Sequence, residues 1–343
     1  MSSPLPTTAR QWVLYETDNG IDSLKLETAP IPSLGQFDVL VRFHALSLNY
    51  RDIVLSSGNY PRGRKFGCVQ GSDGAGEVLR VGDGVHEFKV GERVATTFFR
   101  SHLSGRFTAA KGQSDLGGHV DGAFRDYGVF PAQGLVKIPY SLNYREAATL
   151  PCAALTAWSC LFSDADEHVQ PGDTVLTQGT GGVSLFALQF AIAARANVIA
   201  TTSSSEKAAM LKTMGAKDVI NYREIEEWGV KARQLSPDQM GADIIVDIGG
   251  AATVGQCLKA GKPGNGQICL VGHRTGGTAQ GLPTTWDVRQ AALKVRSIFV
   301  GSRQQFEDMN KAIDAWKIKP VIDAKTFKFE DLKEAYRYLV SDE

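Results

Sequence analysis

A glycine-lined turn between a strand and an apolar helix constrains this chain more than any other feature. Residues 173–207 read DTVLTQGTGGVSLFALQFAIAARANVIATTSSSEK. The pattern predicts a strand ending at Gln178, a tight turn, a helix and a second strand within about 30 residues, as in the first unit of a dinucleotide-binding fold. Glycines let the backbone approach a pyrophosphate, toward which the first N–H groups of the helix point. The predicted phosphate site is Gly179, Thr180, Gly181, Gly182 and Val183, where the helix begins.

The end of the second predicted strand indicates which dinucleotide binds. Enzymes that use NAD place Asp or Glu there, where it accepts hydrogen bonds from the ribose 2′-hydroxyl. This chain has hydroxyls and a lysine instead, which favour the 2′-phosphate of NADP, so we predict NADPH/NADP as the cofactor. The predicted 2′-phosphate contacts are Thr202, Ser203, Ser204, Lys207 and, after the third strand, Tyr222. Taken without its neighbours, Lys207 would fit a solvated surface lysine equally well.

Three later segments fit the nicotinamide half of the cofactor. Parallel sheets bind ligands at the carboxyl ends of their strands, and DIGG and VGH end two predicted strands. A following strand brings FVG to the same region. The candidates are Gly249, Val271, Gly272, His273, Phe299 and Val300. For His273, a loop cap is favoured over a catalytic role.

The residue pattern changes along the chain and predicts two parts with different kinds of structure. The first 140 residues consist of short runs rich in Val, Leu and aromatics between Gly, Pro and Asp, a pattern that predicts a small, partly open β-barrel. From about residue 143, strands and helices alternate and the strands are continuously apolar. This alternation predicts an α/β fold with a doubly wound parallel sheet.

Six ordered motifs carry a resemblance to a known family. They are LSLNYRDIVLSSGNYP, GSDGAGEVLRVGDGV, FKVGERV, AATLPCAALTAW, GTGGVSLFALQFA and GAKDVINY. With them the chain resembles the medium-chain dehydrogenase/reductase superfamily, in its zinc-independent quinone oxidoreductase and alcohol-dehydrogenase-like branch. The resemblance implies a GroES-like catalytic barrel of residues 1–150 and 301–343. It also implies an inserted Rossmann NADP-binding domain of residues 151–300, and a cleft between them where cofactor and substrate meet.

Zinc-binding members of that superfamily have ligands that this chain lacks. They carry Gly-His-Glu where this chain has Gly71-Ser72-Asp73, and an early Cys near Leu48-Asn49-Tyr50. Only Cys152 matches a catalytic ligand position, and catalytic zinc needs three protein ligands. The stretch FFRSHLSGRFTAAKGQSDLGGHVDGAFRDY, which corresponds to the structural-zinc lobe, has no cysteine. We therefore expect no metal.

Without zinc, hydrogen-bond donors must stabilise the charge that develops during hydride transfer. The candidate catalytic residues are Tyr60, Asn49, Tyr50 and Cys152. Alternatively, Tyr60 is a half-buried tyrosine in a loop without a catalytic role. Cys152, likewise, is alternatively a small buried hydrophobic side chain. Asp52 is expected to cap or pair locally. The segment of residues 100–121 is long, Gly-rich and polar, which predicts a lid or a binding loop. His119 would be a proton donor only if it faces the cleft.

Composition limits the expected partners and location of the protein. Lys plus Arg and Asp plus Glu both number 37, which argues against nucleic-acid or anionic-membrane partners. Five scattered cysteines, no signal sequence and no apolar run of about 20 residues favour a cytoplasmic protein. A homodimer through the apolar strand SIFVG is expected, partly by analogy.

The leading hypothesis is hydride transfer from NADPH to a small carbonyl or alkene substrate: a quinone, an enone or another conjugated carbonyl compound. Alternatives are an alcohol dehydrogenase or ketone reductase, an enoyl reductase acting on acyl thioesters, and a nucleotide-binding structural protein without turnover.

Overall fold

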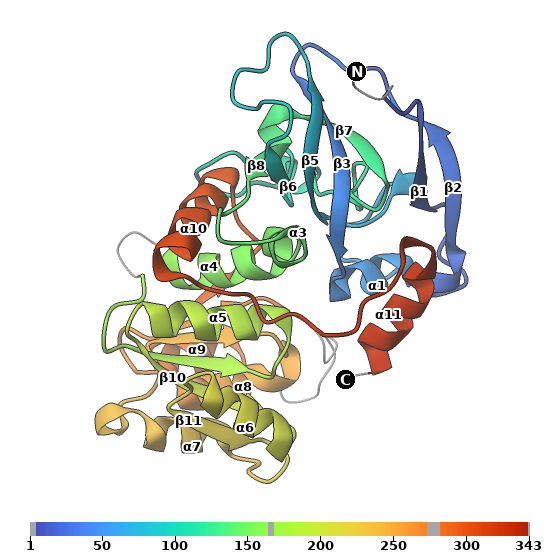
Figure 1. The fold of residues 1–343 in the computed structure, drawn as a ribbon. Helices are drawn as coiled ribbons and strands as arrows, with labels where there is room; N and C mark the ends of the chain where they lie inside the picture. Colours follow the sequence, from blue (N-terminus) through green and yellow to red (C-terminus); the bar gives the residue numbers. More distant parts are fainter. Residues whose placement is uncertain (1–4, 164–167, 273–281, 342–343) are drawn as a thin grey trace. The chain divides into compact units, whose positions relative to one another are not determined.

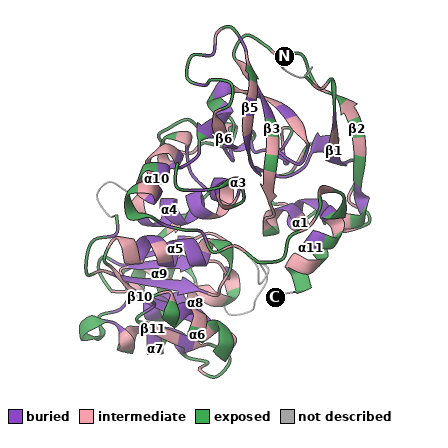
Figure 2. Ribbon diagram, viewed as in Figure 1, coloured by how far each residue is buried: buried purple, intermediate pink, exposed green. Residues whose placement is uncertain are grey.

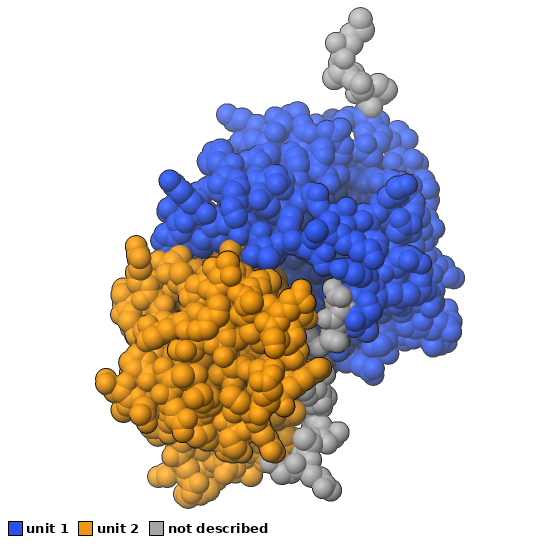
Figure 3. All heavy atoms as spheres, turned by 60° about the horizontal axis from the view of Figure 1, so that its bottom comes forward, with its two compact units in different colours: residues 1–152, 301–343 blue, residues 153–300 orange. Residues whose placement is uncertain are grey.

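The computed structural model describes residues 5–163, 168–272 and 282–341 (Figure 1). The chain folds into two compact units, one of Met1–Cys152 with Gly301–Glu343 and one of Ala153–Val300, which Figure 3 distinguishes by colour. The chain therefore leaves the first unit after Cys152 and returns to it at Gly301.

Two antiparallel sheets form the framework of the first unit. The larger has the order β7 (Tyr127–Pro131), β3 (Asp38–Ser47), β5 (Asp73–Val81), β6 (Arg93–Thr96), β8 (Leu135–Lys137). The smaller has the order β2 (Leu24–Pro30), β1 (Thr8–Leu14), β4 (Cys68–Val69). The β3–β5 register pairs Ser47 with Asp73, so the residues that follow β3 lie beside the start of β5.

Short helices and turns complete the first unit. They are η1 (Gly20–Ser23), α1 (Tyr50–Ser56), α2 (Ala109–Gly112), η2 (Ala132–Gly134), α3 (Tyr144–Ala147), α10 (Arg303–Trp316), η5 (Phe329–Asp331) and α11 (Leu332–Ser341). The C-terminal α11 buries Tyr336 in a cluster with Trp12, Leu14 and Phe124. The last segment of the chain is thus part of the core of the first unit.

A six-stranded parallel sheet forms the second unit, as predicted. Its order is β11 (Asp218–Asn221), β10 (Asn197–Thr202), β9 (Thr174–Gln178), β12 (Ile244–Asp247), β13 (Gln267–Leu270), β14 (Lys294–Ser297). The strand order reverses between β9 and β12, where open α/β sheets bind their ligands. The remaining elements are α4 (Leu155–Phe162), α5 (Gly182–Ala193), α6 (Ser205–Thr213), α7 (Trp228–Leu235), η4 (Pro237–Gln239), α8 (Ala251–Ala260) and α9 (Thr285–Ala291). Strands β9 and β10 and helix α5 are mostly buried (Figure 2).

Local structure departs from the sequence-based expectations in three places. Pro151 does not simply break a helix but lies in a π-helical turn, η3 (Leu150–Ala154). The edge strand β14 ends at Ser297, so it covers only the first residue of SIFVG, although Ile298 N–H still bonds the Leu270 carbonyl at 2.9 Å. Within residues 100–121, predicted to form a lid or a binding loop, Ser114–Gly118 is buried. Across the described residues, no helix is long and apolar enough to span a membrane.

Candidate functional site

The glycine turn of the second unit joins β9 to α5 and leaves its backbone accessible. Gly179 has a φ of +72°, which favours glycine, and its N–H bonds the Thr201 carbonyl at 2.7 Å. Gly181 is the N-cap of α5, and a Cβ placed there would meet no atom within 4 Å. The helix begins at Gly182, one residue before the predicted start, and Ser184 donates back to the Gln178 carbonyl at 2.6 Å. The turn therefore leaves free space in front of a helix N-terminus.

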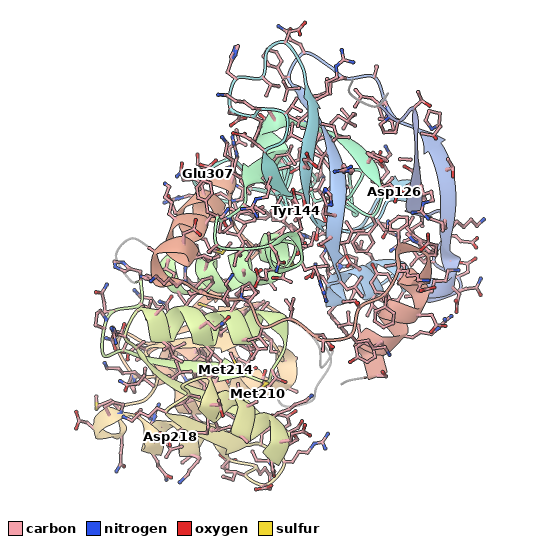
Figure 4. The ribbon with its side chains drawn as sticks, viewed as in Figure 1. Asp126, Tyr144, Met210, Met214, Asp218 and Glu307 are labelled. Atoms are coloured by element: carbon pink, nitrogen blue, oxygen red, sulfur yellow. The ribbon has the colours of Figure 1, made fainter. Side chains whose placement is uncertain are left out.

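The predicted 2′-phosphate residues cluster at the carboxyl end of β10. Tyr222 N–H bonds the Thr202 carbonyl at 3.0 Å, so Tyr222 follows β11 directly beside this end. Ser204 is the N-cap of α6 and accepts a hydrogen bond from Lys207 N–H at 3.1 Å. Ser203 lies between them, and the Tyr222 and Lys207 side chains are exposed. Figure 4 marks α6 and β11 by Met210, Met214 and Asp218. Five predicted residues and the positive end of α6 thus meet at one strand end.

Gln178 is a site residue that the sequence did not identify. Its Oε1 accepts hydrogen bonds from Ile248 N–H and Gly249 N–H, each at 3.2 Å, and its Nε2 donates to the Cys257 thiol at 3.1 Å. The carboxamide therefore ties the end of β9 to the end of β12. No sequence signal reveals this role, because it depends on a contact across 70 residues.

The remaining predicted cofactor residues lie at the ends of β12, β13 and β14. Val271 N–H bonds the Asp247 carbonyl at 2.9 Å, and a Cβ at Gly272 would approach the Ile248 carbonyl oxygen to 2.3 Å. Only glycine fits at this close approach. Phe299 is 45% exposed, and Val300 has an unusual φ of +52°. His273 lies outside the described residues.

In the first unit, Asn49, Ser72, Asp73 and Cys152 come together. Asp73 Oδ1 accepts from the Ser72 hydroxyl at 2.5 Å and Oδ2 accepts from Cys152 N–H at 3.1 Å. Asn49 lies beside this carboxyl group and lowers its pKa, although Asn49 Nδ2 makes no well-aligned hydrogen bond within the described structure. Both oxygens of Asp73 are therefore already used by neighbouring donors.

Burial dominates the electrostatics of this cluster. It raises the pKa of Asp73 to about 7, although the Ser72 hydroxyl acts in the opposite direction. Burial likewise raises the pKa of Asp52 to about 6 against the attraction of Arg51. The pKa of the Cys152 thiol rises well above its ordinary value through burial and the neighbouring Asp73. The thiol is therefore protonated at neutral pH and is no activated nucleophile.

Tyr60 belongs to a second cluster, built around the buried Asp115. Asp115 Oδ2 binds Arg51 Nη2 at 2.7 Å and lies 3.4 Å from the Tyr60 hydroxyl, while Oδ1 contacts His119 Nδ1 at 2.5 Å. Arg62 donates to the Tyr60 oxygen, and the guanidinium carbons of Arg51 and Arg62 lie 5.4 and 5.3 Å from the Tyr60 ring centroid. Both arginines also act electrostatically on Cys152. The two clusters are thus neighbours in one unit.

Two predicted residues at the start of α1 have different surroundings. Tyr50, the first residue of α1, is 39% exposed. Asp52 accepts a hydrogen bond from Asn49 N–H at 2.9 Å and lies near the buried phenol of Tyr336. The expected local capping role of Asp52 agrees with this geometry. Asp115 and Tyr336 carried no recognisable signal in the sequence, because both act through distant contacts.

The described residues contain no group of three or more His, Cys, Asp or Glu side chains able to hold a metal ion. His102 and His119, the histidines of the stretch that corresponds to a zinc lobe, do not form such a group. His102 is buried, and burial lowers its pKa to about 4.

Comparison with known proteins identifies the family. Residues 35–140 match the family described as Alcohol dehydrogenase GroES-like domain, and residues 182–315 match the Zinc-binding dehydrogenase family. A Zinc-type alcohol dehydrogenase-like protein of Schizosaccharomyces pombe is 42% identical over 333 residues, covering 96% of this chain and 95% of the relative. The chain belongs to the medium-chain dehydrogenase/reductase superfamily.

Solved structures of medium-chain dehydrogenase/reductase type agree with the fold. A Sinorhizobium meliloti 1021 protein assigned to the alcohol dehydrogenases superimposes with a TM-score of 0.87 at 37% identity, covering 98% of this chain and 97% of that one. A quinone oxidoreductase of Pseudomonas syringae pv. Tomato DC3000 gives a TM-score of 0.80 at 26% identity, covering 97% and 96%. The predicted superfamily and the α/β fold with Rossmann-like and GroES-like parts are confirmed, and the protein is an oxidoreductase of a superfamily that binds a nicotinamide cofactor.

Proposed function

We propose that this chain is an NADPH-dependent reductase of quinones, enones or other conjugated carbonyl compounds, and that it works without catalytic zinc. The observation that carries the proposal is the engaged carboxyl group of Asp73. It lies next to Ser72, which replaces the imidazole of zinc-binding relatives, and its two oxygens accept hydrogen bonds from the Ser72 hydroxyl and from Cys152 N–H. Charge stabilisation in the first unit then depends on hydrogen-bond donors.

The donor set near Asp73 does not fit the zinc ion that the family description implies. Zinc takes thiolate, imidazole or carboxylate ligands, and a catalytic site needs three of them. Here a hydroxyl stands in place of the imidazole, and the Cys152 thiol has a raised pKa. Binding zinc would require deprotonating a buried thiol and breaking both hydrogen bonds of Asp73.

The second unit fits NADPH. The space before Gly181 and the N-terminal N–H groups of α5 suit the pyrophosphate, because no side chain fills that position. At the end of β10, the hydroxyls of Thr202, Ser203 and Ser204, with Lys207 and Tyr222, suit a 2′-phosphate. The nicotinamide end would lie by Gly249, Val271, Gly272, Phe299 and Val300. Bound there, the cofactor supplies a hydride.

Tyr60 is the proposed hydrogen-bond donor to the substrate oxygen. Its own oxygen accepts from Arg62, and this polarises the O–H bond, while the contact with Asp115 at 3.4 Å is too long to hold the proton firmly. The nearby arginines favour the negative charge that develops on the substrate oxygen. Asn49 would orient the substrate or the nicotinamide ribose, and Tyr50 and Cys152 would line the same region.

A second candidate is reversible oxidation of an alcohol to a ketone. The names of the Schizosaccharomyces pombe and Sinorhizobium meliloti relatives favour it. The absence of three suitable metal ligands among the described residues argues against it, since an alkoxide is best stabilised by a Lewis acid.

Steady-state assays separate the two candidates. NADPH oxidation should be fastest with a quinone or an enone, slower with a saturated ketone, and unaffected by prior dialysis against a chelator. Product analysis distinguishes alkene from carbonyl reduction. Loss of activity after chelation, with recovery on adding zinc, would reject the proposed mechanism in favour of the alcohol dehydrogenase.

A further inference from the structure

We propose that the first unit contains a pocket for a phosphate dianion, built around the buried guanidinium of Arg125. The pocket has a volume of about 270 Å³. Its polar lining residues are Lys65, Arg100, His119, Asp121 and Arg125, with Phe130 on its apolar wall. This site is independent of the proposed NADPH site, which lies in the other unit.

Arg125 is a buried cation whose donors are not all matched by acceptors within the described residues. Its side chain lies just before β7, with its guanidinium carbon 4.9 Å from the Phe130 ring centroid, and the residue is only 5% exposed. Its Nε atom has no hydrogen-bond partner within the described structure. Burial lowers the pKa of Arg125 to about 10, so the group remains charged at neutral pH. A desolvated charge of this kind is costly unless an anion accompanies it.

Neither of two nearby acidic residues, Asp121 and Asp126, forms an ion pair with Arg125 within the described structure. Asp126, labelled in Figure 4, accepts from Arg10 through both oxygens, at 2.8 and 3.0 Å. Asp121 attracts Arg125 electrostatically, but its Oδ1 accepts from Val69 N–H at 3.1 Å. Neither carboxylate therefore saturates the guanidinium, whose planar set of donors matches the oxygens of a phosphate.

The charge of the pocket selects a dianion. Among the charged lining residues, Lys65, Arg100 and Arg125 are cations and Asp121 is an anion, so these four side chains carry a net charge of +2. The His119 ring is oriented by Asp115 through Nδ1, so Nε2 is the nitrogen left to meet a ligand. A phosphate dianion neutralises the pocket fully, whereas a monocarboxylate neutralises half of the charge. The volume suits inorganic phosphate or a small phosphate ester.

Calorimetric titration at constant ionic strength tests the proposal. Inorganic phosphate and glycerol phosphate should each bind the full-length protein at one site and compete with each other, while acetate should bind at least tenfold more weakly. R125Q should abolish phosphate binding.

Because R125Q alters a buried side chain, K65Q and R100Q provide the second test. Both side chains are exposed, and each substitution should weaken phosphate binding about tenfold without changing the melting temperature. R80Q, at an exposed arginine of β5, is the matched control and should bind like the wild type.

Any of three results would overturn the proposal. The first is phosphate binding that K65Q and R100Q leave unchanged but K207Q removes, which would place the anion at the end of β10 in the second unit. The second is binding of acetate as tight as that of phosphate, and the third is no phosphate binding at all. Phosphate-dependent shifts of the His119 ring signals in NMR, lost in R100Q, would support it independently of enzyme activity.

Discussion

Arg51 and Asp115 form a buried ion pair in the first unit, with 2.7 Å between Nη2 and Oδ2. The Arg51 side chain is 10% exposed and that of Asp115 is 0% exposed. Arg51 comes from α1, and Asp115 comes from the segment after α2, so the pair joins two parts of the unit that lie 64 residues apart. Asp115 also orients His119 and contacts Tyr60.

Breaking this pair should destabilise the protein strongly. Asp115→Asn would leave the buried Arg51 cation with only Asp52, 4.0 Å away, as a counter-charge, so we expect the free energy of unfolding to fall by about 3 kcal/mol in urea denaturation. Glu92→Gln, which removes the exposed pair with Lys137, is the control and should cost less than about 1 kcal/mol. Equal effects of the two substitutions would contradict the structural role of Asp115.

Removing the Tyr60 hydroxyl should slow the reaction more than it affects binding. For Tyr60→Phe we expect kcat to fall about 100-fold, with a small change in KM, because the hydroxyl acts on the developing charge. Tyr140→Phe, at a tyrosine that is 90% exposed, should behave as wild type. If kcat stays the same in Tyr60→Phe, the residue is structural and another donor must be sought.

A methyl group at Gly181 should block the cofactor without disturbing the fold. A Cβ at this position meets no protein atom within 4 Å, and φ is −74°, so Gly181→Ala is compatible with the folded backbone. It would occupy the space proposed for the pyrophosphate, and the Kd for NADPH should rise at least about tenfold while the melting temperature is unchanged. Undiminished NADPH binding would mean that the pyrophosphate lies elsewhere.

Lys207 should determine the preference for the phosphorylated cofactor. Lys207→Gln removes a cation proposed to contact the 2′-phosphate, so NADPH affinity should fall about tenfold and NADH affinity should stay the same. Lys212→Gln, near the far end of the same helix, is the matched control. Fluorescence titration with both cofactors measures the effect, and an equal loss for NADH and NADPH would refute phosphate recognition by Lys207.

The raised pKa of Asp73 should make the protein less stable at alkaline than at acidic pH. The pKa is about 7 in the folded protein against 3.8 ordinarily, so the native state binds this proton more tightly than the unfolded chain does. Its contribution is complete below about pH 4 and is lost as pH rises through about 7. Asp73→Asn should therefore flatten the pH dependence of urea unfolding between about pH 4 and about pH 7. Asp18→Asn, at an exposed site, is the control, and an unchanged slope in Asp73→Asn would contradict the burial effect.

The sequence predicted the local structure of the proposed cofactor site where consecutive residues build it. The glycine turn, the strand end at Gln178 and the hydroxyl-rich residues after β10 all lie in one continuous segment, so local periodicity and residue type were sufficient. The helix start was misplaced by one residue, from Val183 to Gly182, because an N-cap glycine and the first helical glycine look alike in sequence.

The polar, glycine-rich composition of residues 100–121 did not reveal that part of this stretch is buried. Asp115 lies inside it and is fully buried, with Arg51 and Arg62 from another part of the unit and the nearby His119 around it. The role of Gln178 was missed for a similar reason, because its carboxamide bonds backbone groups 70 and 71 residues away.

By itself, the sequence determined the superfamily, the doubly wound sheet and the glycine turn, since these follow from patterns within short segments. Tertiary structure alone decided that Asp73 meets Cys152 across 79 residues and that Arg125 is buried with its Nε unbonded in the described part of the chain. The physical reason is that the charge state of a side chain depends on its solvent exposure and its neighbours, and packing brings together neighbours that the order of residues does not specify.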